Sequence, residues 1–137
     1  MHAAFSPDTR HLAGILLFTV VAIEYGGTHI LSLVRGKAPA TPLQLRLSRA
    51  GHAHAGVLVI LSLVTLPYAD TTNLSGFWEV VARNGIWAAA ILMPAGFFLS
   101  VIGRDVQKTN WFIWLVYIGA VCLAAGVITL GIGLLRA

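Results

Sequence analysis

The sequence predicts an all-α integral membrane protein in which four transmembrane helices form one bundle, a single domain of residues 1–137. Two observations support this fold class. Hydrophobic residues make up 58% of the chain and charged residues only 10%, whereas a soluble domain is about half apolar and about a quarter charged. The apolar residues also gather in four runs, and a helix needs about 20 such residues to cross a hydrocarbon core of about 30 Å. The runs, taken as membrane spans, lie at about 12–34, 50–66, 80–102 and 111–135.

The first span carries an unusual set of polar residues. Residues 1–10 are polar and are expected to precede the helix, but Glu24, Tyr25, Thr28 and His29 lie within the apolar run. Residues four apart share a helix face, so Glu24 can meet Thr28 and Tyr25 can meet His29. Because a carboxylate in lipid costs a few kcal/mol, we expect these side chains to face the bundle interior. Glu24 is then a candidate proton donor or acceptor.

The second span follows a loop that contains one glycine and two prolines. Thr41 as the N-cap and Pro42 in the first turn predict where its helix begins. The helix is expected to start at the membrane surface, to enter the bilayer near Ala50 and to end near Leu66, before Pro67. Its first turns would therefore lie among lipid head groups.

The third and fourth spans contain residues that affect helix geometry. Pro94 predicts a kink inside the third span. In the fourth span Gly119, Gly126 and Gly133 recur every seven residues. Small residues in such a row let two helices approach closely, so helix packing is their expected role.

The distribution of positive charge predicts the topology. Six of the nine Lys and Arg residues fall at the ends of the spans joined by the first and third loops, and three fall at the opposite end. Arg83 and Asn84 lie near that opposite surface, where their expected role is that of helix-start and interface residues. By the positive-inside rule, both termini of this multi-pass protein of the plasma (inner) membrane lie outside the cytoplasm. Positive charges at the ends of membrane spans set the topology and contact lipid head groups. The expected partner of these charges is therefore the lipid bilayer, and no nucleic-acid partner is expected. The six are Arg35, Lys37, Arg46, Arg49, Arg104 and Lys108.

Three histidines fall in one layer of the membrane when depth is counted at about 1.5 Å per residue. They are His29, His52 and His54, and a histidine inside a span is a functional-site hypothesis by default. Residues two apart point about 200° apart, so His52 and His54 cannot both bind one metal from a regular helix. One would face His29, and the other would face a different helix or a neighbouring subunit. This arrangement favours a large planar cofactor, and Arg46 and Arg49, nearer the water, suit carboxylates such as haem propionates.

Short motifs resemble the family of styrene oxide isomerase and hydroxylaminobenzene mutase, which are small four-helix membrane proteins. The Ala-His-Ala-Gly sequence at 53–56 resembles an element early in that family's second helix. Residues 11–16 and the glycine pair at 26–27 are similar to its first helix, and the Gly-Phe-Phe-Leu sequence at 96–99 is similar to its third.

The resemblance implies a homotrimer with haem b at the subunit interfaces and with His54 as the iron ligand. In the isomerases of this family the ferric iron acts as a Lewis acid on an epoxide oxygen, assisted by an asparagine and a tyrosine. This chain departs from that pattern at two places. Leu, Val and Ile occupy residues 58–60, where the asparagine is expected, and Phe98 in the third span has no hydroxyl. The resemblance can therefore hold for haem binding without holding for epoxide isomerisation.

Three functional hypotheses follow. In the first, the protein binds haem b through His54, with His29 or His52 as a possible second ligand, and it acts as an isomerase-like enzyme on a small apolar substrate or in electron transfer or sensing. In the second, His29, one of His52 or His54, and Glu24 bind copper, iron or zinc. In the third, the chain is a structural or accessory subunit of a membrane complex. Glu24 and Tyr117 are the candidate catalytic residues in an enzyme.

Overall fold

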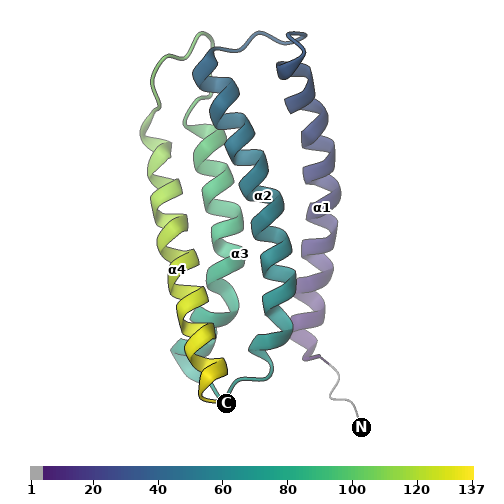
Figure 1. Ribbon diagram of the computed structural model, residues 1–137, viewed down its shortest axis with the longest axis vertical. Coiled ribbons are helices and arrows are strands. Elements are labelled where there is room, and N and C mark those ends of the chain that lie inside the picture. The colour runs from purple at the N-terminus through teal and green to yellow at the C-terminus, as the bar shows by residue number, and fades with distance from the viewer. Residues whose placement is uncertain (1–4) are drawn as a thin grey trace.

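The computed structural model describes residues 5–137 as four long helices that lie side by side (Figure 1). All four are long and apolar enough to cross a membrane, and no strand occurs in the described residues. The all-α fold class of a four-helix transmembrane bundle is confirmed. The helices are α1 (Pro7–Val34), α2 (Pro42–Ala69), α3 (Gly76–Leu99) and α4 (Trp114–Leu135), and the 3-10 turn η1 (Trp111–Ile113) leads into α4.

The helix ends differ from the sequence predictions at both ends of the first hairpin. α1 begins at Pro7 rather than near residue 12, because the Ser6 hydroxyl accepts a hydrogen bond from the Thr9 amide and caps the helix. α2 continues through Pro67 to Ala69. A proline near the end of a helix removes only one backbone hydrogen bond, and the buried Ala69 side chain keeps the last turn packed in the core.

The predicted start of α2 is confirmed. The Thr41 hydroxyl accepts from the Gln44 amide at 3.2 Å, and the Gln44 side chain accepts from the Thr41 amide at 3.0 Å, which together form a capping box. Gln44 also donates to the carbonyl oxygens of Val101 and Gly103, at 3.0 and 2.9 Å. The start of α2 is thereby tied to the loop that follows α3.

Two glycines of the α4 row pack closely against α3, which agrees with the helix-packing role predicted from the sequence, whereas Gly133 lies against Thr72 and Leu74 of the loop before α3. A Cβ atom built on Gly126 would lie 3.1 Å from the Gly85 Cα atom, and one built on Gly119 would lie 3.0 Å from the Met93 amide nitrogen. Contacts this short leave no room for a side chain. The glycines let α3 and α4 form the closest pair in the bundle.

α1 is the most weakly packed helix. Its backbone approaches α2, whereas α3 packs against both α2 and α4. Thr9 and Leu16 are the only buried side chains among the described residues of α1. Much of the surface of α1 therefore remains exposed in a single chain.

The two ends of the bundle differ in chemistry. The loops after α1 and α3 lie at one end, called here the loop end, and the first turn of α1 and the C-terminus lie at the other (Figure 1). This arrangement agrees with the alternating topology expected from four spans. The assignment of the loop end to the cytoplasm stays a prediction from the charges.

A polar cluster joins α1, α2 and α3 at the end of the bundle opposite the loop end. One oxygen of the Asp70 carboxylate accepts hydrogen bonds from the Ser6 and Thr9 hydroxyls and from Arg83, at 2.9, 3.0 and 2.7 Å. Partial burial opposes ionisation of Asp70, but the hydrogen bonds from Arg83, Ser6 and Thr9 outweigh it and lower the pKa of the carboxyl from 3.8 to about 2. Arg83, which the sequence analysis places near this surface together with Asn84, forms an ion pair with Asp70.

Candidate functional site

His54 is fixed by a hydrogen bond to its own helix. Its Nδ1 atom lies 2.8 Å from the Ala50 carbonyl oxygen. Because a carbonyl can only accept, Nδ1 donates this hydrogen bond, and in the neutral form of the ring the Nε2 atom keeps its lone pair. The half-buried ring also lies against Phe97 of α3, with 5.0 Å between the ring centroids. The result is an oriented imidazole with a free nitrogen, which is the state that a metal ligand requires.

His52 occupies the other side of α2. Its ring lies against the glycine pair of α1, where a Cβ atom built on Gly27 would be 3.4 Å from the His52 Nε2 atom. Gly51, which precedes His52, is buried, and a Cβ atom there would lie 3.0 Å from both Phe97 and Phe98. His52 and His54 therefore face α1 and α3 respectively, as their spacing of two residues predicts.

The polar residues of α1 lie where the sequence analysis did not expect them. Glu24, Tyr25, Thr28 and His29 are exposed on the single chain and do not face the bundle interior, so that expectation is wrong. The reason is geometric. The Gly26 and Gly27 side of α1 packs against His52. At about 100° per residue Tyr25 and Thr28 lie on the opposite side of the helix, and Glu24 and His29 lie on its flanks.

The two arginines near the histidines are exposed and available. Arg46 donates from Nε to the Pro42 carbonyl at 3.3 Å, and neither Arg46 nor Arg49 forms an ion pair with a carboxylate in residues 5–137. Helix geometry places both on one exposed strip of α2 together with Ala53 and Val57. His54 borders this strip, which therefore offers two free guanidinium groups, small and apolar side chains, and one oriented imidazole.

The two candidate catalytic residues do not join His54. Tyr117 is exposed on α4, and its ring lies 5.4 Å from that of Trp114. Neither Tyr117 nor Glu24 forms a hydrogen bond with His54 in the described chain. Tyr117 and Trp114 therefore form a pair of aromatic residues of the kind found at membrane interfaces.

No compact metal centre forms within one chain. Across residues 5–137 no three side chains of His, Cys, Asp or Glu come close enough to hold a metal ion. His29, His52 and His54 share a depth but lie on different helix faces. The predicted combinations of His29 and Glu24 with a histidine of α2 are not brought together in the single chain.

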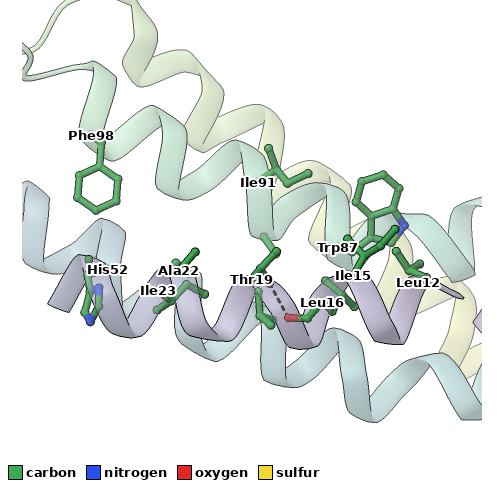
Figure 2. A pocket seen from close by; sticks show the side chains of 14 residues that line it. Leu12, Ile15, Leu16, Thr19, Ala22, Ile23, His52, Trp87, Ile91 and Phe98 are labelled. Atoms are coloured by element: carbon green, nitrogen blue, oxygen red, sulfur yellow. Dashed lines mark hydrogen bonds between the residues drawn. The ribbon is translucent and has the colours of Figure 1, made fainter. Parts of the chain in front are cut away.

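A long apolar groove was not anticipated from the sequence. It has a volume of about 440 Å³ and lies between α1 and α3, with α2 as its floor (Figure 2). The signal that could have revealed it is a set of small residues on all three helices, among them Ala22, Ala55 and Ala90. Residues that define this α1–α3 groove from one end to the other include Leu12, Trp87, Leu16, Ala22, Phe98 and His52.

A second, more polar hollow adjoins the groove. This loop-end hollow has a volume of about 250 Å³ and is lined by His29, Gln44, Ser48 and the backbone around Gly103. Phe98 lines both spaces. His52 lines the groove and His29 lines the hollow, so the two imidazoles belong to adjoining spaces.

The chain was compared with models of known protein families, with curated proteins and with solved structures. None of the three comparisons finds a match.

Proposed function

We propose that the protein is a haem b-binding membrane protein in which the Nε2 atom of His54 is the iron ligand. The observation that supports this proposal is the hydrogen bond of 2.8 Å from Nδ1 to the Ala50 carbonyl. Haem ligation by histidine requires a neutral imidazole with one nitrogen free, and a carbonyl partner on the other nitrogen fixes both the tautomer and the ring orientation.

The residues around His54 fit the rest of a haem. The exposed strip of α2 offers the small side chain of Ala53 below the two free guanidinium groups of Arg46 and Arg49. Arginine binds carboxylates with two parallel hydrogen bonds, so these two residues would hold the propionates. Bound in this place, the haem would supply Lewis-acid or one-electron chemistry at its iron.

The number of ligands bears on which chemistry is favoured. Among residues 5–137 His29 and His52 lie on other faces, and His54 is the single histidine beside the strip. A second ligand from His29 or His52 would come from a neighbouring copy. A haem held by His54 alone would supply Lewis-acid or ligand-binding chemistry, so an isomerase-like or ligand-sensing function is favoured over electron transfer.

The exposed polar face of α1 supports a homo-oligomer. Glu24, Thr28 and His29 lie in a membrane-spanning helix yet are exposed on the single chain. Polar groups in a span normally face protein or water, so contact with a second copy would remove them from lipid. The family resemblance indicates that this oligomer is a trimer, and the charge distribution indicates a plasma membrane protein with both termini outside the cytoplasm.

Absorbance spectra of the detergent-purified full chain test the proposal. The wild-type protein, produced with ample haem, is expected to show a Soret band, which His54→Ala abolishes or shifts and His52→Ala leaves unchanged. After reduction with dithionite, a broad rather than a sharp α-band would indicate a single histidine ligand. A colourless wild-type protein, or a spectrum that His54→Ala does not change, would refute the assignment.

A further inference from the structure

The α1–α3 groove has the shape of a site for one hydrocarbon chain. Its lining runs along α1 from Leu12 to Gly26, which at 1.5 Å per residue is a length of about 20 Å. Its volume of about 440 Å³ lies within the range of small-molecule sites. A space this long and narrow suits an extended single chain better than a compact or two-tailed molecule.

The lining has polar atoms without partners at one end only. The Thr19 hydroxyl donates to the Leu16 carbonyl at 2.6 Å, and the Trp87 indole N–H donates to the Asn84 side chain at 2.8 Å. In the described residues neither ring nitrogen of His52 has a hydrogen-bond partner, and neither is fully buried. A ligand of the groove therefore meets an unused polar group only where His52 lies, at the left of Figure 2.

The polar space continues beyond that end. The loop-end hollow shares Phe98 with the groove and adds the imidazole of His29 and the side chain of Ser48. An apolar channel followed by a polar hollow matches the two parts of an amphiphile. The haem site proposed at His54 uses neither His29 nor His52 of the same chain.

The charge of the loop end indicates the sign of the head group. Six Lys and Arg residues lie toward this end of the bundle, and Asp105 is the one acidic residue in the loop that follows α3. A basic surface of this kind attracts anions from the membrane interface. A carboxylate is the anionic head group that a single hydrocarbon chain most simply carries.

We propose that the α1–α3 groove binds a long-chain fatty acid, with the hydrocarbon chain extended toward Trp87 and the carboxylate between His52 and His29 beside Phe98. The ligand enters sideways from the bilayer, because the groove is open between α1 and α3. This site is separate from the proposed haem site, which lies on the other side of α2. A negative result for either site would leave the proposal for the other unchanged.

Binding of radiolabelled palmitate to the full chain in detergent micelles tests the groove. Ala22→Phe places a large side chain in the groove from an exposed position and is expected to weaken binding at least tenfold. Val21→Phe is the matched control, because Val21 is exposed on the same helix but does not line the groove. Equal binding by the two variants would show only partitioning into the micelle and would overturn the proposal.

Three further measurements test head-group recognition and the orientation of the ligand. His52→Leu is expected to weaken palmitate binding about tenfold, since a hydrogen bond to a charged group is lost. Hexadecane should compete with palmitate poorly, and equally strong competition would refute recognition of the head group. In the wild-type chain a diazirine at the terminal carbon should crosslink near Leu12 and Trp87, and one beside the carboxylate should crosslink near Gly26 and Phe98. Crosslinking that is uniform along the groove, or reversed in direction, would overturn this placement of the fatty acid. That conclusion would not depend on whether the absorbance spectrum shows bound haem.

Discussion

The polar cluster at Asp70 should account for a measurable part of the stability of the bundle. Asp70→Asn keeps the size of the side chain but removes the charge that Arg83 contacts at 2.7 Å. The pKa of Asp70 falls from 3.8 to about 2 on folding, and each pKa unit is worth 1.36 kcal/mol, so the ionised carboxylate contributes about 2 kcal/mol. Asp70→Asn should lower the free energy of unfolding at pH 7 by about that amount.

The sign of the pH dependence follows from the lowered pKa. The contribution is complete above the unfolded-state pKa of 3.8 and is lost as the pH falls through about 2. Reversible unfolding by SDS in mixed micelles, followed by circular dichroism, should show wild type and Asp70→Asn differing at pH 7 and converging as the pH falls from about 4 toward 2.

Asp105→Asn is the control for this prediction, because Asp105 is exposed in the loop after α3 and has a positive φ of 50° that asparagine tolerates. Its effect should stay within about 0.5 kcal/mol. If Asp70→Asn destabilised no more than Asp105→Asn, or if its effect were the same at pH 7 and pH 2, the assigned role of the cluster would be wrong.

Two other predictions concern packing and topology. Gly126→Leu should destabilise the bundle by at least about 3 kcal/mol in the same unfolding assay, because its Cβ atom would meet the backbone of Gly85, whereas Gly131→Leu should have little effect because its Cβ atom meets nothing within 4 Å. Single cysteines at Lys108 and Ala137, placed in a cysteine-free background, should react with a membrane-impermeant thiol reagent from opposite sides of the cell membrane, with Ala137 accessible from outside; labelling of both from one side would contradict the four-span topology.

The parts of the fold that the sequence predicted depend on local rules. The four apolar runs, the Thr41 cap and the glycine row of α4 each depend on residues a few positions apart. Helix geometry likewise predicted that His52 and His54 point to different neighbours. These features follow from the periodicity of one helix and need no knowledge of how the helices are placed.

The features that sequence reasoning missed depend on distant residues. Asp70 is bonded to Thr9, which is 61 positions away, and no local pattern indicates that pairing. The groove needs small residues of three helices at one depth. The rule that polar residues of a span face the protein interior failed for Glu24 and His29, because it does not say whether that interior belongs to one chain or to several.

The placement of two histidines on opposite sides of α2 gives a final prediction. His54 lies against Phe97 of α3, and His52 lies against the glycine pair of α1, so the two rings share no partner. Effects of substitutions that share no partner usually add. The double variant His52→Leu/His54→Ala should therefore lose the Soret band to the same extent as His54→Ala alone, and it should bind palmitate as weakly as His52→Leu alone. If His54→Ala also weakened palmitate binding, or if palmitate shifted the Soret band of the wild-type protein, the two sites would be coupled through α2, and the separation inferred from the geometry would be wrong.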